Sequence, residues 1–191
     1  MNTNKIDWNF IHAMEGMVKT GYVPKNKDGS VMGTSGVTIA AGYDLGAHSV
    51  ADVKQLKLDP KLEAKLTKYC GLKQKAAVDF LAKNPLSLTD AECNAIMRPL
   101  EALHATNVAA MYNKGVSFGH SFDQLTAGQQ TMIASVAYQY GNLPTKTPRL
   151  WKDIMGFDWE GAVKELRNFG DAYQPRHNRE ALLVAKELGI K

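Results

Sequence analysis

The chain has 191 residues, of which 45% are hydrophobic and 22% are charged, with a formal net charge of +4. This balance excludes a disordered chain and is typical of a globular protein with one well-buried core, or with two lobes that share one. The lysines and arginines are scattered rather than clustered. The net positive charge indicates attraction to polyanionic surfaces. Its scattered distribution argues against a nucleic-acid-binding protein.

The N-terminus carries no recognisable export signal. Residues 1–7 lack a long apolar stretch, and no segment of the sequence reaches the length of a membrane span. We therefore expect a protein that is made in the cytoplasm without a cleavable signal peptide and that has no integral membrane segment.

The cysteines and histidines give no indication of a metal site. Cys70 and Cys93 are the only cysteines and do not have metal-ligand spacing, and the five histidines form no ligand pair of the HxxxH kind. Buried free thiols are the preferred interpretation, and a single disulfide is the alternative. We expect no metal ion and no cofactor.

The first predicted elements are a helix and a small sheet. Apolar residues from Ile6 to Met17 recur at helical spacing, which predicts a helix over residues 5–18 with Asn4 as its N-cap. The pattern then changes, because short β-prone pieces at residues 22–23, 31–32 and 37–39 are separated by glycine-containing turns. This segment predicts an antiparallel hairpin or a three-stranded ribbon.

Helices are expected in the rest of the chain. Pro99 is expected to separate two of them. The helix after Thr126 is the most apolar, so we expect it to be central and buried on most sides. Capping boxes mark three helix starts: Ser49 with Asp52, Thr89 with Glu92, and Thr126 with Gln129. The expected helices cover residues 50–56, 60–71, 73–83, 90–97, 100–113, 126–140, 148–155, 159–169 and 176–188.

The sequence therefore predicts an α+β protein that is mainly α-helical and forms a single domain, residues 1–191. A first lobe over about residues 1–58 contains the N-terminal helix and the antiparallel β-ribbon. A helical lobe follows over about residues 59–191. No internal repeat and no long linker divides the sequence.

Two carboxylates near the ribbon are candidate catalytic groups. Glu15 lies near the end of the first apolar segment, and Asp44 lies where the ribbon returns to a helix. Glycoside hydrolysis needs one carboxyl group that gives its proton to the leaving oxygen and one carboxylate that activates water. A proton donor at neutral pH needs partial burial, which we expect for Glu15 among apolar neighbours. Taken singly, a solvated glutamate and a turn-capping aspartate are the commoner roles.

Thr38 is the third candidate. It alternates with Val37 and Ile39, so if those two side chains face the core, the Thr38 hydroxyl points into a cleft and can orient water. Threonine is also common in strands for its β-propensity alone. The combination of all three residues around a glycine-rich hairpin is more specific than any one of them.

The hairpin carries a family resemblance. The run Gly-Val-Thr-Ile-Ala-Ala-Gly-Tyr at residues 36–43 resembles the Gly-x-Thr-Ile-Gly-x-Gly hairpin of phage-type muramidases, with Ala40 in place of one glycine. The commoner phage pattern has an aspartate six residues before the threonine, where this chain has Met32. With Asp44 six residues after Thr38, the pattern is most similar to the toxin domain of the bacteriocin pesticin and to related endolysins.

The resemblance implies a lysozyme-like fold and a muramidase, a glycoside hydrolase that cleaves the β-1,4 bond between N-acetylmuramic acid and N-acetylglucosamine. It implies catalytic roles for three residues: Glu15 as the proton donor, and Asp44 with Thr38 as the groups that activate water. Attack from the opposite sugar face would invert the anomeric centre.

The resemblance also implies substrate-binding residues. Tyr43 is expected to shape the floor of the cleft, and Tyr138 and Gln139 to line the saccharide groove. Arg179 matches an arginine that approaches the catalytic glutamate. An inward-packing tyrosine and an ordinary surface arginine are the alternatives for Tyr138 and Arg179.

Two other functions compete with hydrolysis. A lytic transglycosylase would use one carboxylate and no water, and an inactive descendant would only bind peptidoglycan. The expected partner is peptidoglycan, without nucleic acid, and the protein is expected to act in the periplasm as a monomer. An endolysin released with a holin-type partner, a tail enzyme, and a delivered toxin with an immunity protein all remain open.

Overall fold

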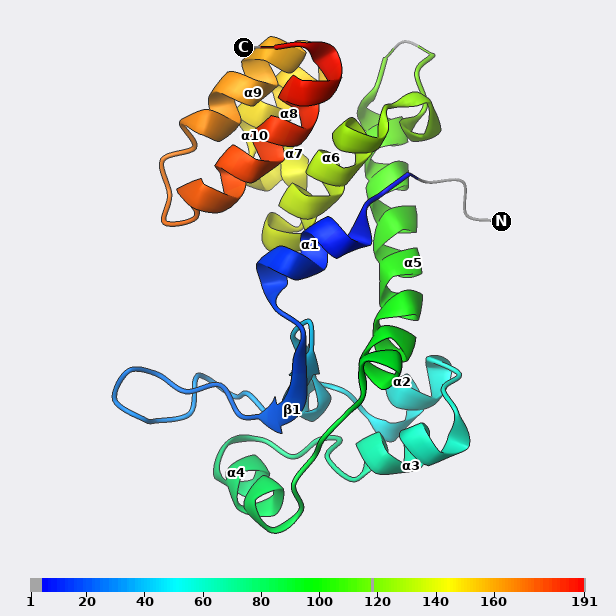
Figure 1. Cartoon of the computed structure of the whole chain (residues 1–191), viewed down its shortest axis with the longest axis vertical. Helices are drawn as coiled ribbons and strands as arrows, with labels where there is room; N and C mark the ends of the chain where they lie inside the picture. The colour runs from blue at the N-terminus through cyan, green and yellow to red at the C-terminus, as the bar shows by residue number, and fades with distance from the viewer. Residues whose placement is uncertain (1–4, 118, 191) are drawn as a thin grey trace. The chain divides into compact units, whose positions relative to one another are not determined.

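The computed structural model describes residues 5–117 and 119–190 and is mainly helical, with a small antiparallel sheet (Figure 1). This confirms the fold class predicted from the sequence. In chain order the elements are α1 (Trp8–Glu15), β1 (Val18–Tyr22), β2 (Thr38–Ala40), β3 (Tyr43–Asp44), the 3-10 helix η1 (Leu45–Ala47), α2 (Val50–Gln55), α3 (Pro60–Thr67), α4 (Gln74–Lys83), α5 (Asp90–Gly115), the 3-10 helix η2 (Phe122–Gln124), α6 (Ala127–Tyr140), α7 (Leu143–Lys146), α8 (Pro148–Met155), α9 (Trp159–Arg167) and α10 (Gln174–Leu188).

The chain folds as two compact units. The ribbon unit comprises Glu15–Leu100, and the helical unit comprises the residues up to Met14 together with those from Glu101 onward. This division differs from the lobe boundary expected near residue 58. The reason is that α2, α3 and α4 share a hydrophobic core with the ribbon, whereas α1 shares a core with the C-terminal helices.

The ribbon unit is built on the three-stranded sheet. Its strands lie in the order β1-β2-β3, and both pairs are antiparallel. Thr38 lies opposite Asp44, and Ile39 lies opposite Tyr43. Val37 and Ile39 are fully buried, as their alternation with Thr38 predicts. These two side chains anchor the sheet in the core of the unit.

The helical unit is organised around α6. Every residue from 128 to 137 is buried, which confirms the prediction that this helix is central. The helix packs against α10, and α10 also packs against α9 (Figure 1). Gly141, with φ of 76°, ends the helix.

Two predicted helix boundaries are wrong. The first helix was expected over residues 5–18, but α1 ends at Glu15 because Gly16 has φ of 80° and Val18 already pairs with the sheet. The two helices expected on either side of Pro99 form one helix, α5. A proline inside a helix removes one backbone hydrogen bond. Burial of Ile96 in one core and of Ala105 in the other holds both halves of α5 in place despite that loss.

The predicted caps are confirmed wherever the structure describes them. All three capping boxes form, and Asp59 caps α3 ahead of Pro60. Gly189 ends α10 in the left-handed conformation. Asn4, the expected cap of the first helix, lies outside the described residues. The short helix α7, capped by Asn142, was not predicted.

Cys70 and Cys93 are free thiols, so the disulfide alternative is excluded. Burial raises the pKa of both thiols, more than their charged neighbours do.

Across residues 5–117 and 119–190, no helix combines the length and the apolar character that crossing a membrane requires.

Candidate active site

The Asp44 carboxylate accepts hydrogen bonds from two backbone N–H groups. Gly46 N–H donates to Oδ1 at 2.8 Å, and Gly36 N–H donates to the same oxygen at 3.1 Å. The bond from Gly46 caps the 3-10 helix η1, so Asp44 does play the capping role that is usual for a loop aspartate. Its other oxygen, Oδ2, has only a 3.3 Å contact with Gly36 N. Of the two carboxylate oxygens, Oδ2 is therefore the one with the weaker hydrogen bonding to the backbone.

Two glycines allow the backbone to approach the carboxylate this closely. A Cβ on Gly36 would lie 2.4 Å from the Leu72 carbonyl oxygen and 2.5 Å from Gly46 Cα. A Cβ on Gly46 would lie 2.3 Å from the same carbonyl oxygen. All three distances are shorter than van der Waals contact, so a side chain at either position would push the loop away. The glycines of the hairpin motif therefore hold Asp44 in position.

Thr38 faces Asp44 across the β2–β3 pair. Side chains directly opposite in an antiparallel pair have Cβ atoms about 4.5–5.5 Å apart. The Thr38 side chain is 4% exposed, and its hydroxyl donates to the Gly36 carbonyl oxygen at 3.4 Å. The structure thus brings Thr38 and Asp44 together through Gly36. The hydroxyl is buried, however, rather than open to a cleft as the sequence suggested.

Glu15 is the last residue of α1 and belongs to the same unit as Thr38 and Asp44. Gly16 turns the chain from α1 into β1. The Glu15 side chain is exposed, which corrects the expectation of partial burial among apolar neighbours. Because β2 lies between β1 and β3, the strands next to the two carboxylates are two strand spacings apart, about 9–10 Å.

Tyr43 is part of the core of the ribbon unit. Its ring is 6% exposed and stacks on the His48 ring, with centroids 4.4 Å apart. Burial, with smaller contributions from Cys70 and Asp52, raises the pKa of the Tyr43 hydroxyl to about 12. The Tyr43 ring therefore packs in the core of the ribbon unit, and its hydroxyl stays neutral at physiological pH.

Tyr138 and Gln139 lie at the end of α6, in the helical unit. Tyr138 is half-buried and packs edge-on against His104, with centroids 5.3 Å apart. The Gln139 amide differs, since its Oε1 and Nε2 are both buried and neither has a hydrogen-bond partner among the described residues. A buried polar group without a partner costs about 1–3 kcal/mol.

Arg179 lies on the exposed side of α10, with its guanidinium 5.8 Å from the centroid of the Phe10 ring. Both residues belong to the helical unit. This is the geometry of a cation–π contact. It fits the surface-arginine alternative that the sequence left open.

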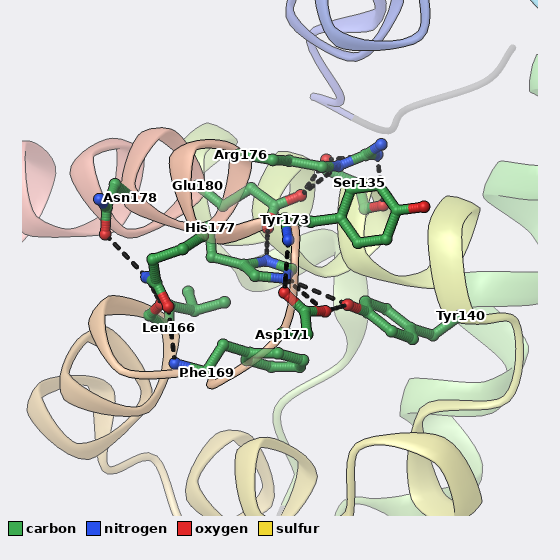
Figure 2. A network of polar contacts seen from close by, with 11 residues as sticks. Ser135, Tyr140, Leu166, Phe169, Asp171, Tyr173, Arg176, His177, Asn178 and Glu180 are labelled. Atoms are coloured by element: carbon green, nitrogen blue, oxygen red, sulfur yellow. Dashed lines mark hydrogen bonds and ion pairs between the residues drawn. The ribbon is translucent and has the colours of Figure 1, made fainter. Parts of the chain in front are cut away.

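Sequence reasoning missed a buried polar network at the start of α10 (Figure 2). Glu180 and His177 are fully buried, and His177 Nδ1 lies 2.8 Å from Glu180 Oε2. The other carboxylate oxygen, Oε1, accepts from Arg176 Nε at 3.1 Å and from Ser135 Oγ at 2.5 Å. The available signal was the four-residue spacing of Arg176 and Glu180, which puts opposite charges on one helix face.

Among the described residues, no group of three or more histidine, cysteine or acidic side chains is arranged to hold a metal ion.

The sequence profile of one protein family matches residues 5–160, and its description reads "Pesticin: Bacterial toxin homologue of phage lysozyme, C-term". The chain belongs to the pesticin family. The matched residues include the whole ribbon and α1 to α8.

Several solved structures share the fold of this pesticin-family chain. The muramidase domain of SpmX from Asticaccaulis excentricus aligns over 92% of this chain and 92% of that chain, with a TM-score of 0.50 and 12% sequence identity. At that identity the likeness shows the lysozyme-like fold alone. No curated protein sequence is a significant match.

Proposed function

We propose that this pesticin-family protein is a muramidase that hydrolyses the β-1,4 bond between N-acetylmuramic acid and N-acetylglucosamine in periplasmic peptidoglycan. The carrying observation is the Thr38–Asp44 pair of β2 and β3, which Gly36 ties together in the unit that also contains Glu15. A carboxylate held by backbone N–H groups beside a hydroxyl suits a general base that positions water.

The proposed reaction uses the two carboxyl groups on opposite faces of the sugar. Glu15 gives its proton to the glycosidic oxygen as the bond from that oxygen to the anomeric carbon breaks. Water attacks the anomeric carbon from the other face and gives a proton to Asp44 Oδ2. Inverting enzymes hold their carboxyl groups roughly 6.5–9.5 Å apart, which leaves room for the water.

Substrate would supply the burial that Glu15 lacks in the free protein. A glycan strand laid over the Glu15 side chain would exclude water from it.

The test is mass spectrometry of isolated sacculi after digestion. A muramidase releases muropeptides with reducing N-acetylmuramic acid ends, and digestion in water labelled with oxygen-18 adds one label per cleaved bond. Release of anhydro-muropeptides without label would replace hydrolysis by lytic transglycosylation. Sacculi that bind the protein and stay intact would replace it by an inactive binding protein.

A further inference from the structure

We propose that Gln74 is a positioning residue for Asp44, and that it acts through the peptide group between Ser35 and Gly36. This role rests on the proposed function, in which Asp44 activates water. It adds a residue from the start of α4, which lies outside the hairpin motif. All four residues belong to the ribbon unit, so the role needs no contact with the helical unit.

One peptide group lies between Gln74 and Asp44. Its carbonyl oxygen, that of Ser35, accepts from Gln74 N–H at 2.8 Å. Its nitrogen, that of Gly36, donates to Asp44 Oδ1 at 3.1 Å. Hydrogen bonds in a chain polarise one another, so a bond at the carbonyl oxygen strengthens the N–H group as a donor. Gln74 therefore fixes this peptide group and strengthens its bond to the carboxylate.

The segment 71–74 also holds the hairpin at both ends. Gln74 Nε2 donates to the Gly33 carbonyl oxygen at 3.1 Å, in the turn that precedes β2. Gly71 N–H donates to the Leu45 carbonyl oxygen at 3.2 Å, directly after β3. The chain before β2 and the chain after β3 are thus bonded to the same short segment.

Gly36 connects this segment to both groups that are proposed to activate water. Its backbone forms an isolated β-bridge with Lys73, the neighbour of Gln74. Its N–H donates to Asp44, and its carbonyl oxygen accepts from the Thr38 hydroxyl at 3.4 Å. A shift of Gly36 would therefore disturb the carboxylate and the hydroxyl together.

Gln74 makes its contacts in a left-handed backbone conformation. Its φ is 51°, in a region where residues other than glycine are uncommon and β-branched residues are outliers. This conformation costs free energy in any residue with a Cβ atom. The two hydrogen bonds that Gln74 donates to the turn at residues 33–35 offset that cost.

The test compares Gln74→Gly with Gln74→Val. Both variants lose the side-chain bond to Gly33, but glycine adopts left-handed backbone readily and valine does not. We expect Gln74→Gly to keep kcat on sacculi within about threefold of the parent. Gln74→Val should lower kcat by about five- to thirtyfold. KM should be unchanged in both variants, because Gln74 acts through Asp44 and not through the substrate.

The order of the two variants separates positioning from a role in starting α4. Glycine is a poorer helix former than valine, so a residue that only starts the helix would make Gln74→Gly the more damaged variant. Gln74→Ala should fall between the two, and it takes the place of Gln74→Val if that variant does not fold. Gln55→Val is the matched control, because Gln55 is an exposed glutamine on α2 in the same unit. Its kcat should not change.

The amide proton of Gly36 measures the same coupling without turnover. Its NMR resonance should move upfield in Gln74→Val, because a weaker bond to Asp44 deshields the proton less, and should stay near the parent value in Gln74→Gly and Gln55→Val. A folded Gln74→Val protein with the parent's kcat and Gly36 resonance would overturn the positioning role, and so would a larger loss in Gln74→Gly. If the parent leaves sacculi intact, the proposed function fails, whereas the Gly36 resonance still decides whether Gln74 holds the Asp44 carboxylate.

Discussion

Asp44 combines two roles that sequence patterns treat as alternatives. Its Oδ1 caps η1 through Gly46, whereas Oδ2 is engaged only by the longer contact with Gly36. The cap fixes the carboxylate opposite Thr38, so the structural role prepares the catalytic one rather than competing with it. A capping oxygen and a reacting oxygen can belong to the same carboxylate.

This geometry predicts how substitutions at the two carboxylates separate activity from stability. Glu15→Gln removes the transferable proton, and Asp44→Asn removes the acceptor for the proton of water. The asparagine oxygen can still accept from Gly46 N–H, so the fold should be kept. Each change should lower kcat on sacculi by about 10²–10⁴-fold, with a melting temperature close to that of the parent.

Asp28→Asn is the control for that experiment. Asp28 is exposed, and hydrogen bonds from the Ser30 side chain and backbone lower the pKa of its carboxyl. It lies in a turn outside the strands, so its replacement should leave kcat within about threefold of the parent, the ordinary context-dependent scatter. A folded Asp28→Asn protein as inactive as Asp44→Asn would mean that the general base has been assigned to the wrong aspartate.

At the scale of elements, local capping chemistry is the most regular feature of the chain. Side chains three residues apart satisfy the first N–H groups of α2, α5 and α6. These bonds involve neighbours in sequence, so they form wherever the residue pattern occurs and the helix is stable. They set where helices begin but do not determine how the helices pack.

The capping box of α5 predicts an acid-sensitive contribution to stability. The hydrogen bond from Thr89 N–H, followed by the Lys65 contact, lowers the pKa of Glu92 below its ordinary value of 4.5. A lowered carboxyl pKa stabilises the fold above the unfolded value, and this contribution is lost as pH falls through the folded value. Glu92→Gln keeps a capping acceptor, as Gln129 does in α6, but has no charge.

We therefore expect the parent to melt at a higher temperature than Glu92→Gln at pH 7, and the difference to shrink steadily as the pH is lowered below 4.5. Thermal unfolding followed by circular dichroism across this range measures it. A difference that is independent of pH would show that the charge of Glu92 contributes nothing and that only its shape matters.

At the scale of the whole molecule, the chain has two hydrophobic cores. Which helix packs in which core does not follow the order of the helices along the sequence. α1 joins the C-terminal helices, whereas α2, α3 and α4 join the ribbon. The division falls inside α5, between Leu100 and Glu101. Both candidate carboxylates and Thr38 belong to one unit, and the Gln139 amide belongs to the other.

The net charge of +4 and the isoelectric point near 9.0 predict a salt dependence of activity. Long-range attraction to an anionic cell surface is screened over about 8 Å at physiological ionic strength, so lysis of outer-membrane-permeabilised cells should slow as salt rises beyond that range. Cleavage of a short uncharged muropeptide analogue should change much less. Turbidity and product release measure the two rates, and equal salt sensitivity would contradict steering by the global charge.

The sequence by itself determined the local features of this protein: the caps, most helix starts, an antiparallel ribbon near the N-terminus, and the Glu15–Thr38–Asp44 motif with its glycines. These depend on residues close together in the chain and on backbone sterics, which act before the chain is packed. The sequence did not determine the strands of the ribbon, because the strand expected at residues 31–32 is only an isolated bridge from Val31 to Lys25, and the third strand is Tyr43–Asp44. Only the tertiary structure decided that α5 runs through Pro99, that Glu15 is exposed and the Thr38 hydroxyl buried, and that Glu180 and His177 form a buried network. Each of these depends on which surfaces meet across long sequence separations, because burial, and not spacing, sets whether a polar group is solvated, paired or left for a ligand.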